Sequence, residues 1–329
     1  MLPLYLAGEV NWLTSQSFYH GLPLLHEEGI ILCWPREPYV SLGCHQDWND
    51  FDDTSGIAVV RRKVGGSLVY LDPQQVFFQI VLDPSNHPRL KTPDQWYRFA
   101  LAPVVSCLRH WGLDAVFKFP ADILINDRKI SGNAGGQIED SVVVVGNILL
   151  SFSPAMMAQV RAGTQEFKRA FAESMSRHLV TLGELRPAPY EKGPTEVMHG
   201  LAQFFAQEMG AERQALPWNR WEGVFAQVGR RLTRSAWLHA RGYRPPYHQV
   251  KVREGIYLRQ PREEAFSGII AEVDTENKML TGLWNSPRAL PLPLRAQTLV
   301  DYVPDLEFRR VLGQLLDVSL SNSSSIVTS

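Results

Sequence analysis

Short apolar runs separated by glycine, proline and aspartate turns dominate the first 150 residues and predict strands. The clearest runs are residues 29–35, 39–45, 57–83, 122–126 and 141–152, which are rich in the β-branched and aromatic residues that strands favour. We expect the first two to form a hairpin and the third to form a meander of three strands. The last should pair with the fourth and be buried on both faces, with Gly146 marking a close backbone approach.

One helix is predicted with particular clarity, over residues 93–111. Thr92 is placed to cap it, Pro93 stands at its first position, and Gln95 completes a capping box. Its apolar residues recur at three- and four-residue spacing, and Gly112 follows where a C-terminal cap belongs.

Three other segments have helical periodicity: 8–27, 194–210 and 219–232. Gly21 and Pro23 should kink or split the first of them. The other two are expected to flank a sheet.

From about Tyr247 the pattern changes to alternating strands, followed by a helix near 305–317. This predicts a small α+β domain at 245–317, after a first domain at 1–244. The serine-rich end, 318–329, is predicted to be disordered.

Composition narrows the class of protein. The 329 residues are 45% hydrophobic and 20% charged, which is typical of a globular protein with a substantial core and excludes a disordered or fibrous chain. The formal net charge of -1 offers no overall field to attract nucleic acid or an anionic membrane. There is no run of about 20 apolar residues and no basic region before an apolar segment at the N-terminus. We therefore expect a cytoplasmic protein with no nucleic-acid or membrane partner.

Cysteines and clustered aspartates are assigned no chemistry. Cys33, Cys44 and Cys107 form no CxxC pair and are odd in number, so buried reduced thiols are expected. A nucleophilic Cys44 beside His45 would need a base brought near by folding. The acidic segment 47–53 lacks the glycine and the terminal glutamate of a calcium loop, so a solvated loop is expected.

The first candidate site is the turn RRKVGGS, residues 61–67. Arg61 and Arg62 carry planar guanidinium forks beside Gly65 and Gly66, where the backbone can approach a ligand closely. This pattern suits a phosphate or a carboxylate. A basic surface turn, in which the glycines only allow positive φ, explains it equally well.

The second candidate site is PADILINDRKISGNAGG, residues 120–136. A short strand over 122–126 leads into an Asn-Asp pair that tolerates tight-turn dihedrals. Lys129 lies between this strand and a glycine-containing turn over 131–136, which is too small to build a core. Such a segment brings backbone close to a ligand or to another chain segment, but taken alone it favours a surface hairpin with a solvated lysine.

Taken in order, these blocks resemble the lipoate-protein ligase branch of the biotin/lipoate transferase family. That family shows RRxSGGGAVYHD, an Asn-Asp strand leading into a KxSG turn, and HGT before an apolar strand. The chain has RRKVGGSLVYLD, then PADILINDRKISG, then Gly146-Asn147 before apolar residues. EPYVSLGCHQD also looks like the family segment that ends here at Gly43 to Gln46. The resemblance covers about residues 1–215 and rests on several separate blocks.

The chain departs from the family pattern at some positions and keeps it at others. Val64 stands in place of a serine, Ser67 of the third glycine, Leu71 of a histidine and Ala121 of the asparagine of Asn-Asp, and Val145 and Asn147 stand in place of the histidine and threonine around Gly146. The matching positions are Arg61, Arg62, Gly65, Gly66, Asp122, Lys129 and Gly132.

The resemblance implies an α+β catalytic domain of mixed and antiparallel sheets flanked by helices, and an ATP-dependent ligase. Lipoate or octanoate would attack the α-phosphate of ATP, and a carrier lysine would then take the acyl group from the acyl-adenylate. Lys129 would be the catalytic residue, a protonated electrostatic clamp rather than a nucleophile. Asp122 would assist Mg²⁺ or orient Lys129. The implied substrate- and ATP-binding residues are Arg61, Arg62, Gly65, Gly66, Ser67, Val69, Tyr70, Asp122, Ser131, Gly132, Asn133 and Gly146.

The resemblance also implies partners. They would be lipoyl carrier domains, such as those of 2-oxoacid dehydrogenases or the glycine cleavage H protein. The C-terminal domain resembles the accessory domain of lipoate ligases, which favours adenylate formation and moves after it. A basic segment could face the acidic surface of a carrier, unless it is only a solvated linker. Its residues are Arg230, Arg231, Arg234, Arg241, Arg244 and Lys251.

Two other functions stay open at this point. The first is octanoyl or lipoyl transfer from a carrier thioester without ATP, which in related transferases needs a cysteine nucleophile. No cysteine follows Cys107, so this chemistry is disfavoured. The second function is that of a ligase-like protein that only binds a cofactor or a carrier. Biotin ligation, in contrast, is disfavoured because the turn RRKVGG lacks the glycine-arginine-glycine-arginine pattern of that branch.

Overall fold

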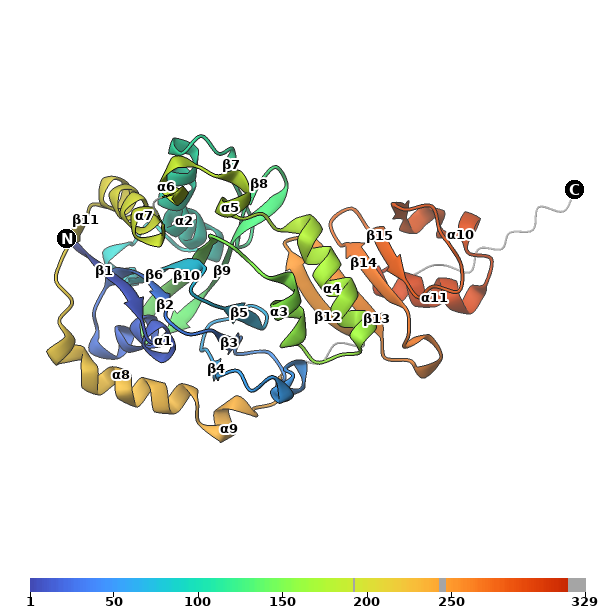
Figure 1. Ribbon diagram of the computed structural model, residues 1–329, viewed down its shortest axis with the longest axis horizontal. Coiled ribbons are helices and arrows are strands. Elements are labelled where there is room, and N and C mark those ends of the chain that lie inside the picture. Colours follow the sequence, from blue (N-terminus) through green and yellow to red (C-terminus); the bar gives the residue numbers. More distant parts are fainter. Residues whose placement is uncertain (192, 243–246, 319–329) are drawn as a thin grey trace, which may run out of the picture.

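An eight-stranded mixed sheet forms the centre of the N-terminal unit (Figure 1). The computed structural model describes residues 1–191, 193–242 and 247–318. The strand order is β11-β1-β2-β6-β10-β9-β8-β7; β11, β1 and β2 run parallel, and the other neighbouring pairs are antiparallel. The strands are β1 (Leu2–Val10), β2 (Gly29–Pro35), β6 (Gln75–Leu82), β7 (Ala115–Lys118), β8 (Asp122–Ile125), β9 (Arg128–Ile138), β10 (Ser141–Leu149) and β11 (Ala211–Arg213).

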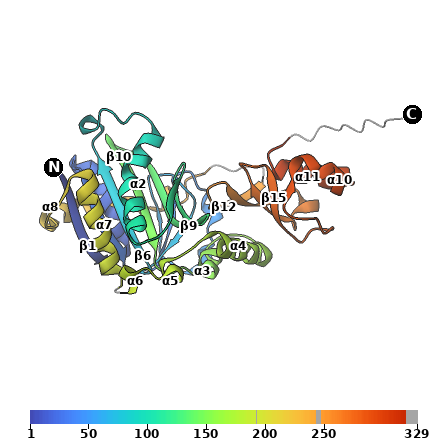
Figure 2. The same cartoon turned by 90° about the horizontal axis from the view of Figure 1, so that it is seen from above.

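Helices cover both faces of this sheet because its central strands are apolar on both sides. In β2, Ile30 and Leu32 belong to the core under α2 and α7, whereas Ile31 and Cys33 belong to the core under α1 and α8. Figure 2 shows α2 and α7 along one face. This alternation follows from the two-residue period of a strand. The helices are α1 (Trp12–Gly21), α2 (Pro93–His110), α7 (Pro194–Met209) and α8 (Trp218–Leu232).

The helix predictions are confirmed except at the start of the first, where residues 8–10 belong to strand β1 and the helix begins at Trp12. Thr92 and Gln95 form both hydrogen bonds of the capping box at the start of α2, and Gly112 follows its C-cap with φ of 80°. The first helix ends at Gly21, and Pro23 begins a separate 3₁₀ turn. Local signals were sufficient here because a cap acts on residues next to it in the chain.

A separate three-stranded sheet overturns two strand predictions. Its order is β4-β3-β5, formed by Val59–Arg61, Tyr39–Leu42 and Val69–Leu71. The predicted hairpin of 29–35 with 39–45 is therefore wrong, because β2 pairs with β1 and β6. The predicted meander over 57–83 is also wrong, since β4 and β5 flank β3 and β6 joins the large sheet. A strand as apolar as β2 needs cover on both faces, which only the centre of the large sheet provides.

The second candidate segment is a strand over most of its length. Strand β8 and its turn are as predicted, with Asn126 and Asp127 at φ of 50° and 59°. Residues 131–136, predicted as a turn, lie inside β9, which separates β8 from β10. The pairing of 141–152 with 122–126 is therefore wrong. Strand β10 is also only partly buried on the side that carries Val145 and Asn147, so the prediction of burial on both faces is wrong as well.

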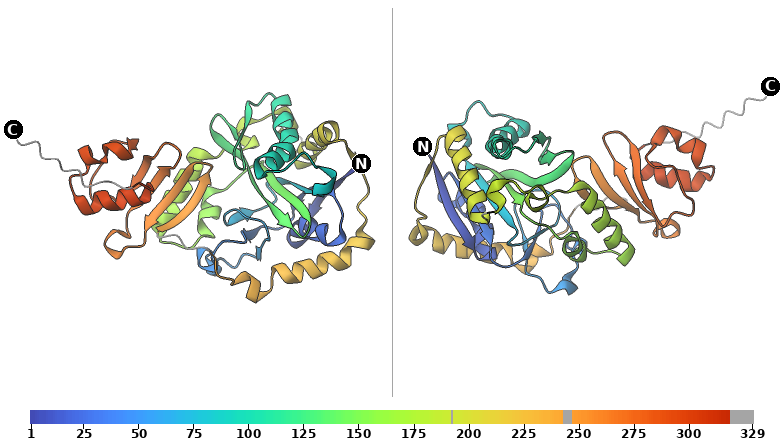
Figure 3. Two further views of the ribbon diagram at one scale, coloured as in Figure 1. Left: turned by 180° about the vertical axis from the view of Figure 1, so that it is seen from behind. Right: turned by 45° about the horizontal axis from the view of Figure 1, so that its top comes forward.

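The C-terminal unit is an antiparallel five-stranded sheet, in the order β12-β13-β14-β15-β16. One face packs on α11 (Leu306–Leu315) and the other packs on α4 (Gln165–His178), which lies between the two units (Figures 1 and 3). The predicted α+β fold class is confirmed. The strands are β12 (Tyr247–Arg253), β13 (Ile256–Pro261), β14 (Ile270–Asp274), β15 (Met279–Trp284) and β16 (Leu294–Arg295).

Two sequence predictions fall outside what the structure describes. The division between residues 244 and 245 lies within 243–246, and the tail predicted to be disordered lies outside the described residues from 319 onward. The division into domains stays a prediction. Among the described residues, no helix combines the length and the apolar character that crossing a bilayer requires.

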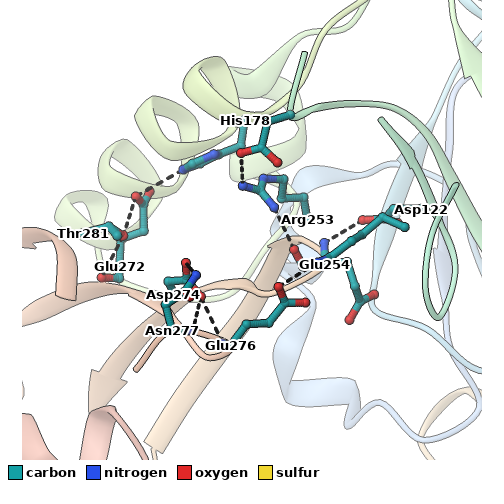
Figure 4. A network of polar contacts seen from close by, with 11 residues as sticks. Asp122, His178, Arg253, Glu254, Glu272, Asp274, Glu276, Asn277 and Thr281 are labelled. Atoms are coloured by element: carbon teal, nitrogen blue, oxygen red, sulfur yellow. Dashed lines mark hydrogen bonds and ion pairs between the residues drawn. The ribbon is translucent and has the colours of Figure 1, made fainter. Parts of the chain in front are cut away.

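A buried carboxylate joins the two units. Glu272 on β14 is 2% exposed and accepts hydrogen bonds from Ser174 and from Arg177 (2.7 Å) on α4. It also contacts His178 at 3.2 Å and Thr281 at 2.9 Å (Figure 4). Burial would raise the pKa of Glu272, but the hydrogen bonds from His178 and Ser174 and the nearby positive charges lower this pKa to about 2. The docked state is thus stabilised by the ionised carboxylate.

We expect Glu272→Gln to lower the free energy of unfolding at pH 7 by about 2 kcal/mol, because it leaves Arg177 without its counter-ion. The folded-state pKa lies below the ordinary value of 4.5. The stabilisation is therefore fully present above pH 4.5 and is lost as the pH falls toward 2. Urea denaturation between pH 7 and pH 3 measures this difference.

The matched control is Glu264→Gln, an exposed glutamate of the same unit, which should change the free energy by less than about 0.5 kcal/mol. A difference between Glu272→Gln and the parent that stays constant down to pH 3 would contradict this account.

Candidate active site

A cavity of about 160 Å³ lies between the eight-stranded sheet and the three-stranded sheet. Strands β6, β9 and β10 form one wall, and β5 forms another. Helices α1, α3 (Pro154–Gln159) and α4 complete it, together with β12 of the C-terminal unit. The apolar side chains in its lining include Tyr70, Leu71, Phe77, Leu149, Phe152, Met157, Phe171, Met175 and Leu179. The polar ones include Gln16, Tyr19, Ser41, Arg62, Gln75, Gln79, Lys129, Asn133, Asn147 and Lys251.

Lys129 lies in this cavity because β9 is irregular at that point. The pairing of β8 with β9 shifts register between Ser131 and Lys129, and such a bulge redirects a side chain. The Nζ atom of Lys129 lies 2.9 Å from Oδ1 of Asp122, and the side chain is 16% exposed. A Cβ atom at Gly132 would come within 3.0 Å of this Nζ. The glycine therefore leaves the space that the ammonium group occupies.

Asp122 holds this lysine from behind the cavity wall. It is fully buried, and its Oδ2 accepts a hydrogen bond of 2.6 Å from the backbone N–H of Glu254. Burial would raise the pKa of Asp122, but the charges of Lys129 and Lys251 and its hydrogen bonds lower that pKa below its ordinary value. The carboxylate is therefore ionised at neutral pH and has a partner on each oxygen.

The surroundings of Asp122 do not fit a magnesium ion. Both of its oxygens are engaged, and it is absent from the cavity lining. Within the described ranges, no group of three or more histidine, cysteine, aspartate or glutamate side chains is arranged to hold a metal. Of the two roles expected for Asp122, the geometry favours orienting Lys129.

Arg62 lines the cavity and holds the RRKVGGS turn in shape. Its guanidinium donates hydrogen bonds to the carbonyl oxygens of Ser41 (2.7 Å), Gly65 (2.8 Å) and Ser67 (2.7 Å). A Cβ atom at Gly66, whose φ is 90°, would lie 2.8 Å from Nη2 of Arg62. The glycine here allows both the turn and the close approach of the guanidinium.

Arg61 is buried away from the cavity. It donates to the carbonyl oxygens of Leu238 (2.6 Å), Ala240 (3.0 Å) and Gln46 (2.5 Å). The indole N–H of Trp237 in turn donates to the backbone carbonyl oxygen of Arg61 (2.7 Å). These bonds fasten α9 (Ser235–Leu238) to β4. In this structure, backbone carbonyls thus engage both guanidinium forks that were expected to bind a phosphate or a carboxylate.

The structure brings most of the predicted site residues together. Those in the cavity lining are Arg62, Gly66, Ser67, Val69, Tyr70, Lys129, Gly132, Asn133 and Gly146. Those outside the lining are Arg61, Gly65, Asp122 and Ser131.

Sequence reasoning missed several residues of the lining, among them polar side chains on β6, α1 and β12. Gln75 and Gln79 share one face of β6, four residues apart, and this polar interruption of an apolar strand was a usable signal. Gln16 and Tyr19 on α1 were visible only as part of a helix. Nothing in the sequence indicated that Lys251 on β12 would reach the cavity, because this depends on how the two units pack.

Asn147, one of the departures from the family pattern, has a defined structural role. Its Oδ1 accepts the backbone N–H of Gly132 (3.1 Å), and its Nδ2 donates to Oε1 of Gln75 (2.6 Å). The side chain therefore links β9, β10 and β6 beside Lys129.

The cysteines do not contribute to the cavity. Cys33 and Cys107 are buried in the two cores of the large sheet, and burial raises the pKa of both thiols. Cys44 is partly buried and is also absent from the lining. Cys33 and Cys107 are buried free thiols as expected.

The chain matches known proteins at three levels: a family profile, curated sequences and solved structures. The sequence profile described as the lipoyl protein ligase A/B catalytic domain matches residues 8–205. The chain belongs to this family. The resemblance stated from the sequence blocks is thereby confirmed.

Curated relatives match this member of the family over part of their length. Lipoate-protein ligase LplJ of Bacillus subtilis is 29% identical over 115 residues, which is 33% of each chain. Lipoate–protein ligase 1 of Staphylococcus aureus is 23% identical over 188 residues, 55% of each chain. The chain thus spans about a third of the length of the first relative and about half of the length of the second.

Solved structures share the fold at low identity. The bipartite lipoate protein ligase of Thermoplasma acidophilum, studied with its E2 lipoyl domain, has a TM-score of 0.63 at 20% identity, covering 74% of this chain and 99% of that one. Lipoate-protein ligase A bound with ATP has a TM-score of 0.58 at 19% identity, with coverages of 72% and 98%.

Gly146 provides a test of how tightly the cavity wall is built. A Cβ atom there would lie 1.8 Å from Oδ1 of Asn133 and 2.5 Å from the Phe78 ring. We expect Gly146→Ala to lower the free energy of unfolding by about 1–3 kcal/mol, since overpacking forces neighbours to move. Urea denaturation measures the loss.

Gly223→Ala on α8 is the matched control. No atom lies within 4 Å of its Cβ position, so alanine should stabilise the helix by up to about 1 kcal/mol. If both variants changed stability in the same direction, the close-approach explanation would be wrong.

Proposed function

We propose that this protein is an ATP-dependent lipoate- or octanoate-protein ligase. The observation that carries the proposal is Lys129, an ammonium group fixed by Asp122 in a cavity that also has an extended apolar lining. Membership of the lipoyl protein ligase A/B catalytic domain family supports it. An acid with an apolar chain needs both features, a dry pocket for the chain and a fixed positive charge for the carboxylate.

The first step would activate the acid. The apolar chain would lie against side chains such as Met157 and Phe171, with its carboxylate toward Lys129. A carboxylate oxygen would bond to the α-phosphorus of ATP, and pyrophosphate would leave with the electron pair of the broken bond. Lys129 would stabilise the negative charge that gathers on these oxygens.

The second step would transfer the acyl group to a carrier lysine. Its neutral amine would attack the carbonyl carbon of the acyl-adenylate, and AMP would leave. Lys129 would again stabilise the charge on the carbonyl oxygen and on the departing phosphate, so one fixed cation would serve both steps.

The proposal includes ATP because a structure with the same fold was solved with it, and Mg²⁺ because this ion accompanies nucleotide phosphates. Among structures with the same fold, a lipoate-protein ligase was solved with ATP and a Thermoplasma acidophilum protein was solved with lipoic acid. Magnesium is usually held by substrate phosphates and water rather than by an all-protein cage. This agrees with the poor fit of Asp122 to a metal.

Transfer from a thioester is less well supported. No cysteine is found in the cavity lining among the described residues. A covalent acyl-enzyme would need such a nucleophile. The ligase proposal needs none.

The decisive experiment supplies ATP, Mg²⁺, lipoate or octanoate, and an apo lipoyl domain. We expect pyrophosphate release and a mass increase of the carrier, both reduced about 10²- to 10³-fold in Lys129→Ala, because a fixed electrostatic donor is lost. Lys91→Ala, an exposed lysine outside the cavity, is the control.

Absence of both signals in the parent protein would refute the ligase proposal. A parallel reaction with an octanoyl thioester and no ATP distinguishes the transferase, which would modify the carrier under that condition.

A basic surface at the end of α8 and on either side of α9 suits an acidic carrier. Arg230, Arg231, Arg234 and Arg241 are exposed, and none of them forms an ion pair within the part of the chain that the structure describes. Arg244 lies outside the described residues, and Lys251 belongs to the cavity instead of this surface. We propose that the four arginines attract the carrier domain.

Reversing two of these charges tests the surface. The double variant Arg230→Glu and Arg231→Glu should raise the KM for the carrier about tenfold at low salt, while pyrophosphate release in the absence of carrier stays unchanged. The control reverses Arg213 and Arg288, exposed arginines elsewhere. Equal effects of the two pairs would argue against a specific surface.

A further inference from the structure

The C-terminal unit contributes a charged side chain to the cavity. Lys251 and Val252, on the outer strand β12, line it together with residues from the N-terminal unit. Val252 belongs to an apolar cluster shared with Phe171 and Met175 of α4. The position of Lys251 is therefore set by a packed contact between the units.

Lys251 and Lys129 are linked through two carboxylates. Nζ of Lys251 lies 2.8 Å from Oε2 of Glu254, and the backbone N–H of Glu254 donates to Oδ2 of Asp122. The other oxygen of Asp122 holds Lys129. Figure 4 shows the backbone nitrogen of Glu254 facing the carboxylate of Asp122. Two ammonium groups and two carboxylates thus balance each other before any substrate binds.

Lys251 stays charged in this position. Burial would lower its pKa, but the charges of Asp122 and Glu254 and the hydrogen bond that Lys251 donates to Glu254 raise it above the ordinary value. Lys251 is therefore an ammonium group at neutral pH. It faces a cavity that already contains Lys129.

Ion pairs hold the C-terminal unit against the N-terminal unit at the end of β12 and at the turn between β14 and β15. Arg253 pairs with Asp127 at 2.6 Å, on the turn that precedes Lys129. Lys118 on β7 pairs with Glu276 at 2.6 Å. The first of these pairs joins the end of β12 to the same short segment of chain that carries Lys129.

We propose that Lys251 is a second cationic residue of the activation step and contacts the phosphate oxygens of the nucleotide. This inference rests on the proposed ligase function. Acid activation brings a carboxylate against a polyphosphate, and these anions repel each other. Transfer brings a neutral amine to an adenylate that carries a single negative charge. A second cation therefore matters most when the acid is activated.

The chemical step needs no proton from Lys251. A carboxylate oxygen of the acid forms a bond to the α-phosphorus, and the bond from this phosphorus to the bridging oxygen of pyrophosphate breaks. Pyrophosphate keeps that electron pair. Lys251 remains an ammonium group throughout and offsets the charge that moves onto the leaving oxygens.

The test separates the two half-reactions in the full-length protein. Lys251→Met keeps the length of the side chain and removes its charge. We expect it to slow pyrophosphate release from ATP and acid about 10²-fold, while transfer from a synthetic acyl-adenylate to the apo lipoyl domain changes less than about threefold. Calorimetry with a non-hydrolysable ATP analogue should show binding weakened about tenfold. Lys251→Arg should recover most of the activation rate, because it restores the charge.

Lys278→Met is the matched control, since it removes an exposed lysine of the same unit. If the parent protein neither activates the acid nor modifies the carrier, the proposed function fails and the role of Lys251 fails with it. If the parent is active and Lys251→Met activates the acid equally fast, only the role of Lys251 is overturned. Equal loss of both half-reactions, with lower stability and no recovery in Lys251→Arg, would show a purely structural residue.

Discussion

A buried carboxylate with two required partners organises this molecule. Asp122 has no exposed surface, so its negative charge depends on the ammonium group of Lys129 on one side and the backbone N–H of Glu254 on the other. Removing one partner of a buried charge pair costs on the order of 3–5 kcal/mol, because the remaining charge is left unsolvated. The position of the cavity lysine and the docking of the C-terminal sheet are therefore coupled through one side chain.

The cavity keeps its shape through backbone contacts more than through side-chain bulk. Arg62 bonds to three carbonyl oxygens across the RRKVGGS turn, and Arg61 bonds to those at the end of α9. Glycines stand where a Cβ atom would collide with these groups or with Lys129. An arginine with its donors committed to carbonyls acts as a rigid brace. This explains how short strands and turns can form a stable wall.

Sequence reasoning succeeded where the information was local and where a motif was present. The capping box at Thr92, the Asn126-Asp127 turn and the family blocks around Lys129 were all visible in the chain. The pairing of strands was not visible in the chain. β2 and β6 pair because both are apolar on two faces, although they are far apart in the sequence. The glycine-rich run that contains Gly135 was interpreted as a turn. In the structure Gly135 lies inside β9, where it allows the hydroxyl of Tyr97 to approach the strand. Lys251 depends on the packing of one unit on the other, about which a strand pattern says nothing.

The apolar cluster beneath α4 belongs to both units at once. Val250, Val252, Ile256 and Leu258 of the C-terminal sheet pack in it with side chains of α3 and α4 that also line the cavity. Separating the chain before β12 would leave one wall of the pocket facing water and would expose an apolar sheet face on the other fragment, a combination that promotes aggregation. A shortened version made for crystallisation or for engineering would therefore need the second fragment produced in the same cell, so that each covers the other as it folds.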